Sequence, residues 1–166
     1  LIEAGSDLSN ALLQNVDLSY EDITGSNLTR ANLDGANLTG VTLTNVTSGG
    51  ITGTPYALDN GVILANGYLI GPGVDLTNAD LTNANLDDAN LTGVTLTNVT
   101  SSGITGTPSA LDNGVILANG YLIGPGVDLT GADLTDVNLT GVNLDGANLT
   151  GVTLTNVTSS GITGTP

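Results

Sequence analysis

The sequence predicts an all-β solenoid, in which the chain turns a corner after each short extended piece and winds into stacked coils. From residue 6 onward a central apolar residue, usually leucine, recurs every five residues, a period that fits neither an α-helix nor a simple strand. The fifth position of the repeat is mostly Gly or Asn, which tolerate the positive φ of a type II turn. The repeats also follow one another in register, as in ANLDG and ANLTG at residues 31–40, which is typical of a repeat architecture.

Each five-residue repeat is expected to supply one wall of a coil. Four such walls would close a square coil of about twenty residues, and successive coils would stack about 4.8 Å apart. Position 3 of the repeat, usually leucine, and position 1, usually small, are predicted to point inward, whereas positions 2, 4 and 5 face water. In the first stretch position 3 is occupied by Leu8, Leu13, Leu18, Ile23, Leu28, Leu33, Leu38 and Leu43.

Repeats such as ANLDG and ANLTG resemble the A-(D/N)-L-x-x motif of the pentapeptide-repeat family. The resemblance covers most of the chain, with the departure that position 3 is never Phe. It implies a right-handed quadrilateral β-helix, and the handedness comes from the resemblance alone.

A variant repeat interrupts the leucine pattern in residues 46–55, VTSGGITGTP. Ser48 and Gly53 stand where leucine is expected, and larger residues occupy position 1, so that the interior volume can be conserved as a close-packed core requires. Pro55 cannot adopt a positive φ, so this corner must use a different turn. The variant and the repeats before it, residues 41–55, recur in residues 94–108 and 152–166.

Two further segments are predicted to form β-hairpins. Residues 61–73, GVILANGYLIGPG, do not fit the repeat, and Asn66-Gly67 lies between two short apolar runs, which is a strong hairpin signal. The same segment returns in residues 114–126, with Asn119-Gly120 at its tip.

Setting both insertions aside leaves a single solenoid domain of about seven coils in residues 1–60, 74–113 and 127–166. Residues 51–77 recur at 104–130 with one difference, a period equal to two coils and one insertion. We therefore expect both hairpins to protrude from one edge of the solenoid, about 10 Å apart, and to stack on each other or along one wall. Their apolar residues would otherwise form an exposed patch.

The composition argues against most kinds of catalysis and ligand binding. The net charge is −15, with Arg30 as the one basic residue and no His or Cys. A positively charged partner is favoured over nucleic acid or an anionic membrane. Without His, Cys or Lys, and without a cleft to tune the adjacent carboxylates Asp87 and Asp88, no enzyme and no cofactor are expected. No calcium-loop motif is present, so no specific metal site is predicted, and no apolar run is long enough to insert into a membrane.

Two functions are compatible with these features. The first is a non-enzymatic spacer, scaffold or protein-interaction column, part of a longer repetitive and surface-exposed or filament-forming protein, with self-association end to end or through the hairpins. Abundant Thr, Asn and Gly favour a secreted or cell-surface location. The alternative is implied by the resemblance, since some pentapeptide-repeat proteins are DNA mimics that bind DNA gyrase or another topoisomerase.

The candidate interaction surface combines outward-facing aspartates with the hairpins. Its acidic members occupy position 2 of their repeats, and its hairpin members are apolar strand residues and the tip residues. The set is Asp75, Asp80, Asp128, Asp133, Val62, Leu64, Asn66, Gly67, Leu117, Asn119 and Gly120.

Overall fold

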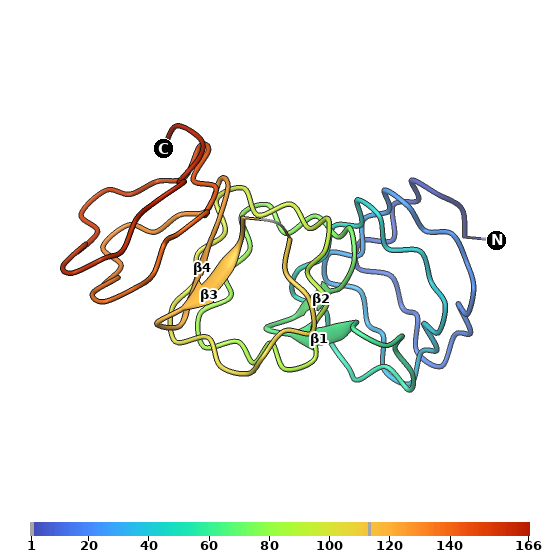
Figure 1. The fold of residues 1–166 in the computed structure, drawn as a ribbon. Coiled ribbons are helices and arrows are strands. Elements are labelled where there is room, and N and C mark those ends of the chain that lie inside the picture. The colour runs from blue at the N-terminus through green and yellow to red at the C-terminus, as the bar shows by residue number, and fades with distance from the viewer. Residues whose placement is uncertain (1, 113) are drawn as a thin grey trace. The chain divides into compact units, whose positions relative to one another are not determined.

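A computed structural model describes residues 2–112 and 114–166 as short extended pieces joined by turns (Figure 1). Isolated parallel β-bridges join residues that are 20 positions apart, for example Asp7 with Asn27 and Asp17 with Asn37. A spacing of 20 residues corresponds to four five-residue walls per coil. The described residues therefore form an all-β repeat solenoid, as the sequence predicted.

Two compact units divide the chain. The first comprises Leu1–Leu76, Leu86–Thr95 and Thr107–Ala110, and the second comprises Thr77–Asn85, Leu96–Gly106 and Leu111–Pro166. Bridges 20 residues apart occur within each unit, as in Asp17 with Asn37 in the first and Asp80 with Thr100 in the second. The continuous single-domain solenoid in residues 1–60, 74–113 and 127–166 stays a prediction, and its positions 1 and 113 lie outside the described residues.

The interior of each unit is built from position 3. Leu33 and Leu86 have no exposed surface, and Leu38 is 3% exposed, which confirms the predicted inward direction. Each leucine carbonyl also closes a turn. The Ala36 N–H donates to the Leu33 carbonyl at 2.9 Å, and Gly35 between them has φ of 68°. This is the geometry of a type II turn with its left-handed residue at position 5.

The corner before Pro55 uses a different left-handed residue. Gly53, at position 3 of its repeat, has φ of 77°. A Cβ on Gly53 would lie 2.5 Å from the backbone nitrogen of Asp34. The Asp34 carboxylate accepts from the Thr54 N–H at 3.1 Å. Gly53 is therefore required both for its backbone conformation and for the close approach of two chain segments.

The repeat is interrupted twice by antiparallel hairpins. In the first unit β1 (Ile63–Ala65) pairs with β2 (Tyr68–Ile70), and in the second β3 (Ile116–Ala118) pairs with β4 (Tyr121–Ile123) (Figure 1). The first tip has φ of 50° at Asn66 and 77° at Gly67. Positive φ at both central residues is characteristic of the type I′ turn.

The prediction that the hairpins protrude is wrong. Leu69 and Ile70 in β2 have no exposed surface, and the same holds for the two equivalent residues of β4. The Ser48 hydroxyl accepts from the Leu69 N–H at 3.0 Å, and the Ile51 N–H donates to the Gly67 carbonyl at 3.0 Å. Burial of the apolar pair explains this arrangement, because Ser48 in place of leucine leaves room inside the coil and supplies an acceptor for the incoming strand.

The predicted insertions, residues 61–73 and 114–126, are too long. Thr47 bridges Asp75, so the coil that contains the hairpin has 28 residues, and Thr100 and Asp128 give the same value in the second unit. The Val74 N–H donates to the Gly71 carbonyl at 3.3 Å, the same turn bond that follows each leucine, and Gly73 has φ of 74°. Gly71 and Gly73 thus take positions 3 and 5 of an ordinary wall.

Only the eight residues 63–70, and their counterparts 116–123, are therefore inserted. Without them the coil keeps its twenty residues. The prediction that both hairpins lie at one edge required thirteen inserted residues, so it no longer has a basis.

Candidate interaction surface

The carboxylates at position 2 are fixed by their own repeat. Asp17 Oδ1 accepts from the Ser19 backbone N–H at 3.0 Å and from the Asn37 side-chain amide of the next coil at 3.0 Å. The first bond is an Asx-type contact to the residue two positions on, and the second links adjacent coils. The outward aspartates are therefore held in defined positions.

Asp75, Asp80, Asp128 and Asp133 occupy this outward position as predicted. Asp75 is half-buried and bridges both Thr47 and Thr95 in the first unit. In the second unit Asp80 accepts from the Thr82 N–H at 2.9 Å. Asp128 and Asp133 each accept from a threonine hydroxyl two residues on at 2.6 Å.

Hydrogen bonding stabilises the ionised form of these carboxylates. The side-chain hydroxyl of the Ser or Thr two residues on, followed by the backbone N–H of the same residue, lowers the pKa of each aspartate below its ordinary value. The aspartates with a lowered pKa are Asp7, Asp17, Asp22, Asp80, Asp128 and Asp133. We call these six residues the aspartate ladder.

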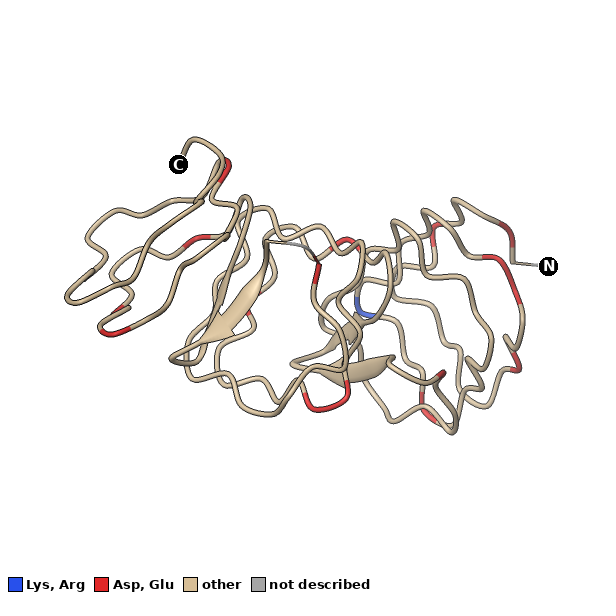
Figure 2. Ribbon diagram, viewed as in Figure 1, with Lys and Arg blue, Asp and Glu red and all other residues tan. Residues whose placement is uncertain are grey.

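Carboxylates are not stacked directly on one another along the described bridges. Each bridged aspartate has Asn or Thr as its partner in the adjacent coil, as in Asp22 with Thr42 and Asp128 with Asn148. Figure 2 shows acidic segments distributed over both units, with Arg30 as the single basic segment. Neutral donors thus separate the charges and reduce repulsion between coils.

Acid is expected to destabilise the folded chain through the aspartate ladder. Because the pKa of each ladder carboxyl is lower in the folded chain than its ordinary value of about 3.9, the unfolded chain binds more protons as the pH falls. The stabilisation is complete above that ordinary value and is lost as the pH falls through the folded pKa. Thermal unfolding followed by circular dichroism should therefore give a lower Tm at pH 3 than at pH 6.

The matched control replaces all six ladder aspartates by asparagine. Asparagine can keep the turn contact, since Asn37 Oδ1 accepts from the Thr39 N–H at 3.1 Å, but it does not titrate. The Tm of this variant should depend less on pH. A wild-type Tm that rises on acidification would contradict the prediction and would show that relief of charge repulsion dominates.

The predicted hairpin residues are docked rather than free. Val62, Leu64 and Leu117 are half-buried. A Cβ on Gly67 would lie 3.1 Å from the backbone nitrogen of Gly50, and Gly120 approaches Gly103 in the same way. The exposed tip residue Asn119 donates to the Thr135 carbonyl at 3.1 Å, and Asn66 is exposed as well.

One predicted aspartate does meet a hairpin. A groove of about 270 Å³ in the second unit is lined by Asp128, by Tyr121 of β4 and by hydroxyl side chains. The sequence analysis missed Tyr121 and these hydroxyls. Their remaining members are Thr82, Thr100, Ser101, Ser102 and Thr130. The signal was Ser101 at a leucine position, which marks where β4 docks.

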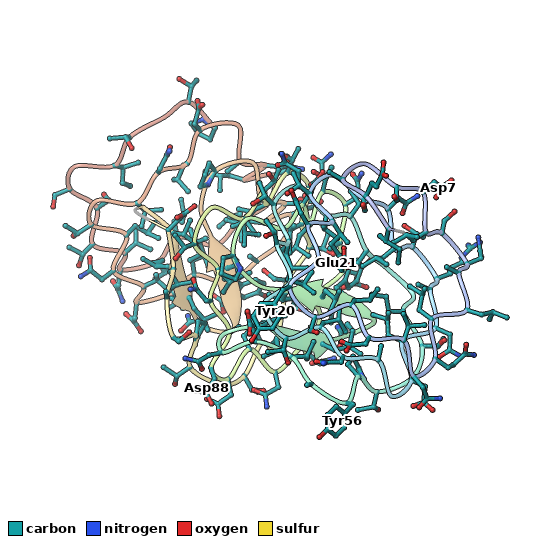
Figure 3. The ribbon with its side chains drawn as sticks, turned by 90° about the vertical axis from the view of Figure 1, so that its right-hand side faces the viewer. Asp7, Tyr20, Glu21, Tyr56 and Asp88 are labelled. Carbon is teal, nitrogen blue, oxygen red and sulfur yellow. The ribbon has the colours of Figure 1, made fainter. Side chains whose placement is uncertain are left out.

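Large apolar side chains outside the predicted set are also exposed. Leu12, Tyr20 and Tyr56 are 77%, 80% and 82% exposed, and Figure 3 shows both tyrosines on the outside of the coils. Tyr20 has φ of 61°, and its ring covers the space where a Cβ of Gly40 would lie. Leu12 at position 2 and Tyr20 at position 5 depart from the repeat, and this departure is the signal by which they could have been found.

In residues 2–112 and 114–166, no three His, Cys, Asp or Glu side chains are grouped so that they could hold a metal ion. No helix suited to crossing a bilayer occurs in this part of the chain.

Comparison with solved structures gives three pentapeptide-repeat proteins. HetL, a pentapeptide repeat protein involved in heterocyst differentiation regulation in the cyanobacterium Nostoc sp. strain PCC 7120, is 22% identical, with 87% of this chain and 58% of that chain covered and a TM-score of 0.26. Rfr23 from the cyanobacterium Cyanothece 51142 is 20% identical, with coverages of 90% and 65% and a TM-score of 0.20. QnrB1, a plasmid-mediated fluoroquinolone resistance protein, is 16% identical, with coverages of 98% and 72% and a TM-score of 0.33. The chain spans less than two thirds of the first two proteins.

A search of curated proteins found no match. The model of the pentapeptide repeats matches eight copies in residues 6–45, 72–99 and 126–158, which is more than half of the chain. Proteins of this family are generally non-enzymatic structural or interaction proteins. The repeats and the coil geometry together show that the chain belongs to the pentapeptide-repeat family.

Proposed function

We propose that this chain is a non-enzymatic structural or interaction solenoid that presents its acidic walls to a basic protein surface. The observation that carries the proposal is the aspartate ladder. Its carboxylates are exposed, yet turn contacts such as the one between Asp17 and Ser19 hold them in place. A surface whose charges are already ordered loses little entropy when a partner binds.

The spacing of these charges favours a protein partner over imitation of DNA. Duplex DNA carries one charge per about 1.7 Å of its axis. On the stack that joins Asp80, Thr100 and Asp128, the two carboxylates are separated by a threonine, which at the usual strand spacing places them about 10 Å apart. Lysine and arginine side chains on a folded protein can match this spacing.

Binding to a basic probe protein in solution, measured as a function of salt, tests the proposal. The ladder variant, with asparagine at all six positions, should bind more weakly than the wild type and with a smaller salt dependence. A control variant removes six other acidic charges by changing Glu3 to glutamine and five aspartates to asparagine. These are Asp34, Asp87, Asp88, Asp136 and Asp145.

If placement of the ladder matters, the control variant should retain most of the affinity although its net charge is the same. Equal losses in the two variants would show that net charge alone is responsible, and would contradict a role for the ordered walls.

A gyrase supercoiling assay separates this proposal from the DNA-mimic alternative. We expect no inhibition at micromolar protein, because the carboxylates are too far apart to replace phosphates. Inhibition by the wild type that is lost in the ladder variant would overturn the proposal and support mimicry.

A further inference from the structure

Three copies of one fifteen-residue segment allow a comparison within the molecule. Residues 94–108 and 152–166 are identical, and residues 41–55 differ from them only in having Gly49 where the others have serine. The first two copies are each followed by a hairpin whose second strand lies against them. Among the described residues the third copy is covered by no hairpin, so it shows which of its groups a hairpin covers in the other two.

Three polar contacts hold the hairpin strand in each of the first two copies. In the first copy the Ser48 hydroxyl accepts from the Leu69 N–H at 3.0 Å, the Ile51 N–H donates to the Gly67 carbonyl at 3.0 Å, and the Asn45 N–H donates to the Gly73 carbonyl at 2.7 Å.

The second copy repeats these contacts. Ser101 accepts from the Leu122 N–H at 3.0 Å. The N–H groups of Ile104 and Asn98 donate to the carbonyls of Gly120 and Gly126 at 3.0 and 2.7 Å. One acceptor and two donors therefore define a binding pattern that occurs twice.

Apolar burial differs between the copies in the same way. Leu43 and Leu96 are 5% and 6% exposed in the first two copies, whereas the equivalent Leu154 is 47% exposed. Ile51 and Ile104 are each 7% exposed, and their equivalent Ile162 is 37% exposed. The same side chains are thus buried beneath a hairpin coil and uncovered without one.

The third copy presents the complete pattern. The Asn156 N–H, the Ser159 hydroxyl and the Ile162 N–H have no hydrogen-bond partner among the described residues. Ser159 also lines a cavity of about 220 Å³ whose other walls are leucine, isoleucine and valine side chains, among them Leu154 and Ile162. The cavity is apolar, and its one polar wall residue is the serine that accepts the strand in the other two copies.

We propose that residues 152–166 form an open docking site for a polypeptide segment with the sequence of the hairpin, supplied in trans. The occupant is the strand Gly-Tyr-Leu-Ile-Gly-Pro-Gly, as in residues 120–126. Its two terminal glycine carbonyls accept from Ile162 and Asn156, its first leucine N–H donates to Ser159, and its Leu-Ile pair covers Leu154 and Ile162. This inference concerns a different face from the aspartate ladder and does not depend on the function proposed above.

Titration of a synthetic peptide onto the full chain tests the inference. The peptide has the sequence of residues 109–126, SALDNGVILANGYLIGPG, and the amide signals of the 15N-labelled chain report binding. We expect saturable shifts of the signals of Asn156, Ser159 and Ile162. A control peptide with aspartate in place of both Leu122 and Ile123 should produce none, because it cannot enter the apolar cavity.

Two protein variants separate strand docking from nonspecific apolar adhesion. Ser159→Ala removes the acceptor and should weaken binding by about two- to tenfold, the range of a single hydrogen bond. Ser160→Ala, at the neighbouring exposed position, should leave the affinity unchanged.

Several outcomes would overturn the proposal. These are the absence of shifts at millimolar peptide, equal shifts with the aspartate peptide, and unaltered affinity in Ser159→Ala. Self-association of the chain that the peptide does not displace would likewise overturn it, in favour of a coil of a second copy as the occupant.

Discussion

Leu33→Ala is expected to lower the free energy of unfolding by about 2–5 kcal/mol. Leu33 has no exposed surface, and its neighbours Leu28, Ala31 and Ala36 are fully buried as well. Removing its side chain loses apolar burial and leaves a cavity that the surrounding wall can fill only partly, because both ends of the repeat are held by turn hydrogen bonds. Chemical denaturation followed by circular dichroism measures the change.

Leu12→Ala is the matched control for this substitution. Leu12 is the same residue type in the same unit, but it occupies position 2 and is 77% exposed. Its replacement should change the stability by less than about 0.5 kcal/mol. Similar effects of the two substitutions would contradict the assignment of position 3 to the interior.

Gly53→Ala is expected to destabilise the chain by about 2–5 kcal/mol, the sum of two costs. Alanine at φ of 77° carries the cost of the left-handed conformation, about 1–2 kcal/mol. Its Cβ would also lie 2.5 Å from the nitrogen and 2.6 Å from the Cα of Asp34, and relieving that overlap costs about 1–3 kcal/mol more. Because the opposing atoms are backbone, the two coils must move apart.

Gly25→Ala separates these two contributions. Gly25 has φ of 69°, but nothing lies within 4 Å of a Cβ placed there. Its replacement should cost only the conformational term, about 1–2 kcal/mol. Equal losses at both positions, measured by the same denaturation experiment, would show that the close approach at Gly53 contributes nothing.

Most of the fold follows from the five-residue period. The period determined which side of each wall faces inward, so the burial of Leu33, Leu38 and Leu86 could be predicted, as could the left-handed turns at position 5. Pro55 indicated an altered corner, but the role of Gly53 was not evident. That role depends on how closely Asp34 approaches from the coil beneath, which no local pattern records.

The hairpins show why the insertion length could not be predicted. Val62 and Gly71 do not resemble the repeat, so the segment around them was assigned to the insertion. In the structure Gly71 takes the place of a leucine, and the missing side chain is replaced by Leu69 and Ile70 from the hairpin itself. An interior filled from elsewhere in the sequence cannot be recognised from the residue at the wall.

The candidate surface was predicted only in part. The outward aspartates follow from position 2 of the repeat, and the Asx contacts follow from Ser or Thr two residues later. The groove between Tyr121 and Asp128 does not, because it depends on the side of the coil on which β4 docks.

The pairing of Ile63 with Ile70 means that the chain leaves the wall and returns to it at nearly the same point. Whatever lies between these two residues leaves the winding of the coils before and after it unchanged. Such a junction is a natural port for grafting. Segments of other lengths, closed by a similar pair of residues and able to fill the space left by Gly71, could be exchanged there as independent cassettes.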